Sequence, residues 1–528
     1  MLEEIIGFAL SVCSLFAADT PRVSSNTETL PENTNVEFRE IENDAQKTFI
    51  NKEYDENNYA RSSEDFVHGR SNLIERNYEN CQNSRKVWRT FWKCLWINLN
   101  IIVASIISIA FCTTLVYVAM NTAYSCLDWQ SHNNNKTLPL SIKRAHIFGR
   151  CVESLTVYLW FPFTMMILFG WKEFKAMFLS TIYIAVIFSE LNVIYKLISF
   201  QFNVYDTYSY YVYPPSVLFW VSIVLSTFVV LYNIRAFKPF IPYSNFHITV
   251  LIIMQFVFCT LISYFYKFII IPEFNNVRVN LFKFLIATSS PLLAIIPTVL
   301  CGHLASRKSS KVVHPGRSFI MVYMIRGGVI FLYRTMQTNF KSIWLFLGLS
   351  LFSAVLNFSK KATQELRFKL WKRMISALNK LRCFKRLQVL PWNTARARRL
   401  KADLEIQDIL FEYNTLVLSQ AYFISYQLQS FNIATEPLLY EFLKRIVIGV
   451  LIDFIFNCLS NYVQMYYYNI PIGRVWKKYW KRHLFANVVV VLVIISYFSR
   501  DLESVFQSHF QKSGASSTKH SIRNCSLL

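Results

Sequence analysis

The sequence has little glycine and contains none of the short motifs on which many soluble enzymes depend. Only 12 of its 528 residues are glycine, and no GxGxxG, P-loop, HExxH or GxSxG pattern occurs. Nothing in the sequence therefore supports nucleotide binding, a zinc peptidase or a serine hydrolase. We expect no enzyme activity, and we assign no catalytic residue, no metal ligand and no cofactor.

Paired cysteines are also missing. The chain has 11 cysteines, but they form no CxxC pair and no Cys/His cluster, so neither a zinc site nor a disulfide scaffold is expected. Cys126 and Cys151 bracket the first predicted outer loop. We predict that they could form a disulfide if that loop faces an oxidising compartment.

Acidic residues are scarce outside the N-terminal region. The chain has 55 Lys and Arg against 32 Asp and Glu, yet residues 1–82 hold 16 of the acidic residues and only 7 of the basic ones. The remaining basic residues lie at the ends of apolar runs and not in a separate basic domain. Nucleic acid is therefore not an expected partner.

Apolar residues are abundant instead. Hydrophobic residues make up 53% and aromatic residues 16% of the chain, which is too apolar for a soluble protein of this size. The sequence predicts an all-α, polytopic transmembrane bundle of ten or eleven spans, embedded in a lipid bilayer. Nothing in it favours the plasma membrane over an internal membrane.

The first part of the chain divides into a polar tail and a bundle. Residues 1–84 are acidic and rich in Asn and Ser, which predicts a largely disordered cytoplasmic tail. Residues 85–358 contain eight apolar runs of spanning length: Leu95 to Met120, Cys151 to Gly170, Ala176 to Phe200, Pro215 to Ile234, His247 to Phe265, Leu281 to His303, Ser318 to Tyr333 and Ser342 to Phe358. Successive loops between spans lie on alternate sides of the membrane. With the N-terminus in the cytoplasm, the Asn135 glycosylation acceptor lies on the outer face, and the loops Trp171 to Lys175 and Ser306 to Arg317 lie in the cytoplasm.

A strongly basic segment, residues 359–406, follows these eight runs. Lys360 to Lys401 contains fourteen Lys or Arg and one acidic residue, which places it on the cytoplasmic side. Part of it has the pattern of a basic amphipathic helix ending before Pro391. We leave three interpretations open: a helix in the headgroup layer that binds anionic lipid, a linker helix packed under the bundle, and a helix bound by a calmodulin-like partner.

The C-terminal transmembrane region, residues 407–500, has two clear spans, Arg445 to Tyr462 and Leu484 to Phe498. The loop between them, Arg474 to His483, is so basic that it belongs in the cytoplasm. It can lie there only if Ile409 to Leu428 also crosses the membrane, although that run contains Glu412 and Asn414. We favour eleven spans over ten, and we predict a polar C-terminal tail over residues 501–528.

Several predicted spans contain polar or ionisable residues. Each ionised group near the centre of a bilayer costs about 3 kcal/mol and needs a partner or a water-filled cavity. We therefore expect Glu190, Arg326 and Asp453 to form a shared polar cluster. The candidate pathway residues are Glu190, Asn192, Lys196, Arg326, Gly327, Gly328, Asp453 and Asn457.

Arg326 stands out because Gly327 and Gly328 follow it within a short span. Two glycines weaken a helix and permit an unwound segment of the kind that forms solute sites. Pro291 and Pro297 interrupt the preceding span in a similar way. The alternative is that the glycines allow close helix packing and the prolines make ordinary kinks.

These features predict a solute or ion transporter or channel with a polar site in the middle of the membrane. The alternative is a membrane receptor or signalling protein that couples through its basic cytoplasmic segment. A membrane scaffold without a ligand is the third reading. The sequence indicates no particular solute.

Overall fold

We describe a computed structural model over residues 84–132, 140–201, 213–237, 244–307, 313, 316–340, 342–378, 394–430 and 435–511. All regular elements in these ranges are helical, which confirms the all-α prediction. Residues 1–83, the Asn135 acceptor and residues 512–528 lie outside them. From Lys93 onward the described helices belong to one compact unit, while residues 84–92 belong to another.

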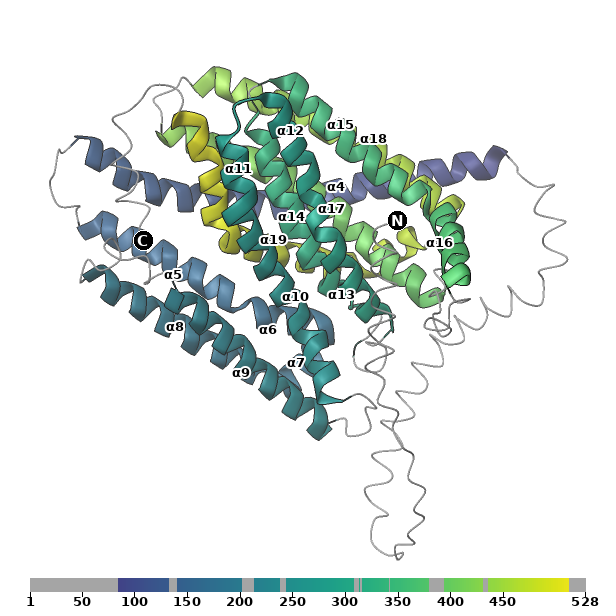
Figure 1. The fold of residues 1–528 in the computed structure, drawn as a ribbon, viewed down its shortest axis with the longest axis horizontal. Helices are drawn as coiled ribbons and strands as arrows, with labels where there is room; N and C mark the ends of the chain where they lie inside the picture. The colour runs from purple at the N-terminus through teal and green to yellow at the C-terminus, as the bar shows by residue number, and fades with distance from the viewer. Residues whose placement is uncertain are drawn as a thin grey trace, which may run out of the picture. The chain divides into compact units, whose positions relative to one another are not determined.

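The first helices are α4 (Ser84–His132), α5 (Leu140–Tyr158), α6 (Trp160–Phe169), α7 (Trp171–Met177), α8 (Ser180–Gln201) and α9 (Tyr213–Phe237). α5, α8 and α9 pack side by side in that order (Figure 1). Gly170 separates α6 from α7 with a φ of 87°, a left-handed conformation that a residue without a Cβ adopts at little cost. The chain can therefore turn sharply there.

The middle of the chain is interrupted twice. A π-helical turn, η3 (Tyr266–Ile270), joins α10 (Asn245–Phe265) to α11 (Ile271–Asn276), and a 3-10 turn, η4 (Ser290–Ala294), joins α12 (Asn280–Ser289) to α13 (Ile295–Arg307). Pro291 is near the start of η4, and a proline cannot donate the backbone hydrogen bond that an α-helix requires. The predicted interruption of this span is thus confirmed at Pro291, whereas the one predicted at Pro297 was wrong, because Pro297 lies in the first turn of α13, where a helix tolerates proline.

The last helices are α14 (Ile320–Thr338), α15 (Ile343–Ala362), α16 (Gln364–Leu378), α17 (Ala395–Ser430), α18 (Thr435–Tyr466) and α19 (Ile472–Gln511). α17 packs against α14, α18 and α19, and α15 packs mainly against α18 (Figure 1). α17 runs through the predicted boundary at residue 406, and α19 continues past residue 500.

In the described ranges, nine segments are long and apolar enough to cross a membrane: Val87–Val116, Cys151–Phe169, Ser180–Ser199, Tyr213–Phe237, Asn245–Asn276, Asn280–Gly302, Ile343–Ala362, Glu436–Tyr466 and Ile472–Phe498. They match nine of the predicted spans and are what a multi-pass membrane protein requires. The other two predicted spans fall on α14 and α17. The total of ten or eleven spans stays a prediction.

α14 and α17 are too polar to count among these nine, and both are enclosed by other helices. In α14 every residue except Arg326 and Ile330 is buried. In α17 only Leu404 and Val417 are not buried between residues 402 and 423. A helix that does not face lipid can carry ionisable side chains, provided that they find partners in the protein.

Several predicted cytoplasmic segments meet at one end of the bundle. Arg396, at the start of α17, donates to the Ala305 carbonyl in α13 at 3.2 Å. The Tyr468 hydroxyl, just before α19, donates to the Ala362 carbonyl at the end of α15 at 2.5 Å. Arg317 donates to the Phe169 carbonyl at the end of α6. We call this the basic end of the bundle; that it faces the cytoplasm stays a prediction.

The opposite end is marked by the ends of α14 and α19. Arg445, early in α18, donates to the Thr338 carbonyl at 3.1 Å, and Asn339 donates to the Val505 carbonyl in α19 at 3.2 Å. α17 starts at the basic end and α18 starts near this opposite end. With 36 residues, α17 is about 54 Å long, which exceeds a hydrocarbon core of about 30 Å.

Candidate functional site

Three acidic residues form a stripe on α17. Glu405, Asp408 and Glu412 are spaced three and four residues apart, so they project from the same face of the helix. Their residues are 4%, 4% and 8% exposed. Buried carboxylates require positive or hydrogen-bonding partners, and α14, α15 and α18 supply them.

Arg326 of α14 is the partner of Asp408. Its Nη2 lies 2.7 Å from Asp408 Oδ2, and the Arg326 side chain is 23% exposed. Arg326 is one of only two residues of α14 that are not buried. The ion pair therefore lies where the packed core of the bundle opens.

Lys361, near the end of α15, makes an ion pair with Glu405. Its side chain is 11% exposed and that of Glu405 is 5% exposed. This contact connects the end of α15 to the first part of α17. It lies one helical turn closer to the basic end than the Arg326–Asp408 pair.

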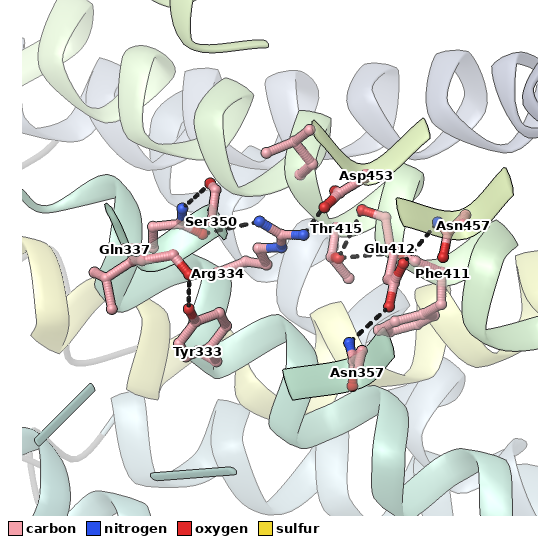
Figure 2. Close-up of polar contacts among 12 residues, drawn as sticks. Tyr333, Arg334, Gln337, Ser350, Asn357, Phe411, Glu412, Thr415, Asp453 and Asn457 are labelled. Carbon is pink, nitrogen blue, oxygen red and sulfur yellow. Dashed lines mark hydrogen bonds and ion pairs between the residues drawn. The ribbon is translucent and has the colours of Figure 1, made fainter. Parts of the chain in front are cut away.

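Glu412 is held by two amides instead of a cation (Figure 2). Asn357 of α15 donates to its Oε1 at 3.2 Å, and Asn457 of α18 donates to its Oε2 at 2.9 Å. Both carboxylate oxygens are therefore satisfied, and α15, α17 and α18 are joined at one point.

Arg334 of α14 lies beside this group (Figure 2). Its Nη2 is 2.7 Å from Asp453 Oδ2 of α18, and both side chains are 4% exposed. Its Nη1 donates to Gln337 Oε1 at 3.0 Å, and Gln337 in turn donates to the Phe346 carbonyl and to Ser350 of α15. Removing one member of such a buried pair costs about 3–5 kcal/mol, because the other charge stays buried without compensation.

A cavity of about 320 Å³ lies against this network. Its charged and polar lining residues come from α12, α13, α14, α15 and α17: Thr288, Thr298, Arg326, Tyr333, Arg334, Ser353, Asn357, Lys360, Lys361, Asp408 and Glu412. The apolar part of the wall includes Pro291, Leu292, Ile295, Val329, Phe352 and Leu356. The turn η4 lies in this wall, so the interruption of the sixth predicted span borders the cavity.

A second polar group connects the central helices nearby. Asn414 of α17 donates to Ser108 of α4 at 3.1 Å and also contacts Asn487 of α19. Asn487 donates to the Tyr323 hydroxyl of α14 at 2.8 Å. Such amide and hydroxyl contacts stabilise helix association inside a membrane.

At the basic end, Asp403 of α17 organises three groups. Arg399 Nε lies 2.9 Å from Asp403 Oδ2, and Arg482 Nη2 lies 3.2 Å and His483 Nε2 3.0 Å from Asp403 Oδ1. The ring of Tyr479 lies 4.4 Å from the Arg399 guanidinium and 4.5 Å from that of Arg482. The backbone of α19 departs from helical geometry at Tyr479, so these contacts fix a kink.

Arg326, Asp453 and Asn457 were predicted from the sequence and belong to the network. The predicted cluster of Glu190, Arg326 and Asp453 was wrong, because Arg326 pairs with Asp408 and Asp453 with Arg334. Glu190 is exposed on α8 and Lys196 is half-buried. Asn192 is buried but donates to Ser154 of α5 at 2.7 Å. α8 packs on α5, α6 and α9, so these three residues lie apart from the site.

Gly327 and Gly328 do not break α14, which is continuous from Ile320 to Thr338. A Cβ on Gly327 would lie 2.9 Å from Ile494 Cδ1 of α19 and 3.1 Å from Phe411 Cζ of α17, and one on Gly328 would lie 3.0 Å from Phe498 Cε2. The glycines thus allow α14 to approach α17 and α19 closely. This agrees with the packing alternative and not with an unwound segment.

Four residues of the network were not predicted from the sequence: Arg334, Lys361, Glu405 and Asp408. Arg334 and Lys361 lay just outside the ranges assigned to spans, and Glu405 and Asp408 were counted with the basic segment or its edge. The signal was present in the spacing of Glu405, Asp408 and Glu412, which is typical of one face of a helix. This spacing is inconspicuous in the sequence, because Glu405 and Asp408 precede the apolar run that begins at Ile409.

Two further predictions concern modification. Cys151 is a free, half-buried cysteine in the structure, and the side chain of Cys126 lies outside the described residues. The disulfide stays a prediction, as does glycosylation of Asn135. In the described residues, no group of three or more His, Cys, Asp or Glu is placed to hold a metal ion.

Comparison with protein-family models, with curated proteins and with solved structures found no match for this chain.

Proposed function

We propose that this chain forms a pathway for a small polar solute or ion across a lipid bilayer, with the Arg326–Asp408 pair at its recognition site. One observation carries the proposal: an ion pair lies in the wall of a cavity between two polar helices that other helices enclose. Ionisable residues at such positions are costly in a membrane protein and commonly mark solute paths.

The surrounding contacts support this reading. The 3-10 turn η4 borders the cavity, and interrupted helices expose backbone groups that can bind a solute. The volume of about 320 Å³ falls at the lower end of the range for small-molecule sites, roughly 300–1,000 Å³. A small solute fits these dimensions better than a lipid or a peptide does.

The test uses the purified full-length chain in liposomes. Currents in KCl and NaCl and the uptake of radiolabelled amino acids, glucose and phosphate would be compared with those of protein-free liposomes. The pair would be replaced by apolar residues in an Arg326→Met, Asp408→Leu double variant, because exchanging both members often preserves stability.

We expect at least one solute or ion to pass through the wild-type chain and this flux to fall at least about tenfold in the double variant. Glu365→Gln is the matched control, since Glu365 forms an exposed ion pair with Lys369 on α16, away from the cavity. Absence of flux for every probe, or equal flux through the double variant, would contradict the proposal.

A receptor is the second candidate, and one contact favours it. Lys361 lines the cavity and pairs with Glu405, two residues from Asp403 and its contacts with α19. A ligand in the cavity could therefore alter the basic end of the bundle, including α16 with its exposed Lys369, Lys372 and Arg373. Ligand binding without flux would favour this candidate. Binding of anionic lipid by α16 stays a prediction.

A further inference from the structure

The Arg326–Asp408 pair differs from the other ion pairs around the cavity. Arg334 and Lys361 line the cavity, but their carboxylate partners, Asp453 and Glu405, do not. Arg326 and Asp408 both line it. Among the described residues this is the ion pair that offers both of its charges to a ligand in the cavity.

Asp408 also has an unused acceptor. Its residue is 4% exposed, and its Oδ2 pairs with Arg326, whereas its Oδ1 is buried without a hydrogen-bond partner in the described part of the chain. Thr298 Oγ1, in the same cavity wall, is likewise buried and unpartnered. A buried carboxylate oxygen without a donor is unfavourable, so a donor group is expected beside it.

We propose that the cavity binds a small zwitterion with an apolar side chain, of the size of an apolar α-amino acid. Its ammonium group would donate to Asp408 Oδ1, and its carboxylate would accept from the Arg326 guanidinium. The inference rests on the proposed function and names the class of solute.

Charge balance favours a zwitterion over an ion of one sign. A zwitterion bound beside the Arg326–Asp408 pair gives each of them an opposite charge, so no buried charge loses compensation. A ligand with only an ammonium or only a carboxylate group would satisfy one residue and oppose the other. The apolar wall around Leu292, Ile295, Val329 and Phe352 would contact the rest of the solute.

The experiment measures binding of radiolabelled leucine to the purified full-length chain by scintillation proximity. Unlabelled leucine, isocaproate and isoamylamine serve as competitors, because the last two are leucine without its amine and without its carboxylate. We expect leucine to bind saturably and each singly charged analogue to compete at least about tenfold more weakly.

Variants separate recognition from folding. Asp408→Asn and the Arg326→Met, Asp408→Leu double variant should lose leucine binding, and the double variant keeps the test valid if Asp408→Asn fails to fold. Asp403→Asn is the matched control, because Asp403 is a buried carboxylate on the same helix that does not line the cavity. It should bind leucine like the wild type wherever it folds.

The inference is overturned if leucine does not bind to the wild type, if the analogues compete equally well, or if the double variant still binds leucine. Water as the occupant of the site would give the first of these results. Flux of another solute without leucine binding removes this inference and leaves the proposed pathway standing. Leucine binding without any flux supports the inference and removes the pathway.

Discussion

Substitutions at Arg334 and Asp453 test how strongly the stability of the bundle depends on their buried ion pair. Replacing Asp453 by leucine leaves Arg334 buried without its carboxylate, so we expect a loss of about 3–5 kcal/mol in the free energy of unfolding. The Arg334→Met, Asp453→Leu double variant should recover most of this loss. Thermal unfolding of the detergent-purified chain, followed by size-exclusion fluorescence, provides the measurement.

The matched control is Glu365→Gln. Lys369 and Glu365 form an ion pair at 2.8 Å, but their side chains are 64% and 50% exposed. Loss of an exposed pair changes stability by less than about 1 kcal/mol. If Asp453→Leu were no more destabilising than this control, the network would not be a buried ionic cluster.

Gly327 gives a second prediction at the residue scale. Alanine at this position places a Cβ within 2.9 Å of Ile494 and 3.1 Å of Phe411, so the helices must shift and we expect destabilisation of about 1–3 kcal/mol. Gly302→Ala is the control, since its nearest neighbour, Val322, is 4.0 Å away. The same unfolding assay applies, and equal melting temperatures for the two variants would refute close packing at Gly327.

Individual residues also show which parts of the polar network could be predicted from the sequence. Arg326, Asp453 and Asn457 were expected to need partners inside the protein, because an ionisable or amide group in an apolar run is rare and costly, and the structure gives each of them one. Their role in a pathway stays a prediction. Their partners could not be identified in the same way, because pairing depends on which helices are adjacent. The predicted contact of Glu190 with Arg326 and Asp453 was wrong for this reason, because α8, which carries Glu190, packs against α5 and α9.

At the scale of elements, α17 decides the topology. We predict that it crosses the membrane, because its first turn contacts α13 at the basic end and α18 begins near the opposite end. Cysteines introduced at Arg398 and at exposed Glu436 should react with an impermeant maleimide from opposite sides of sealed vesicles. The wild-type chain provides the background from native cysteines.

Labelling of both positions from the same side would show that α17 does not cross the membrane and would contradict the prediction of eleven spans. The sequence alone supports a crossing by α17 only weakly, because Glu412 and Asn414 make its run from Ile409 to Leu428 less apolar. The structure explains how such a helix is tolerated: it is surrounded by α14, α18 and α19. Burial by other helices cannot be derived from the composition of one helix.

At the scale of the whole molecule, charge distribution was the most informative feature of the sequence. Segments predicted to be cytoplasmic from their Lys and Arg content, including Ser306 to Arg317 and Arg474 to His483, contact α6 and α17 at one end. The bundle class and nine of its helices were predictable from apolar length. The cavity was not, because its lining comes from α12, α13, α14, α15 and α17, and the packing of helices that lie far apart in the sequence cannot be derived from apolar length.

The proposed pathway requires that the charged residues of α14 and α17 border a water-accessible cavity. Cysteine substitutions at two positions of α15 test it directly: Ser353 lines the cavity, whereas Val355 is 41% exposed on the outer surface and does not line it. Reaction rates with a water-soluble methanethiosulfonate reagent would be measured in liposomes against the wild-type background. We expect rapid modification of Ser353→Cys and little of Val355→Cys; equal rates, or a faster reaction at Val355→Cys, would show that no water-accessible cavity lies beside these charges.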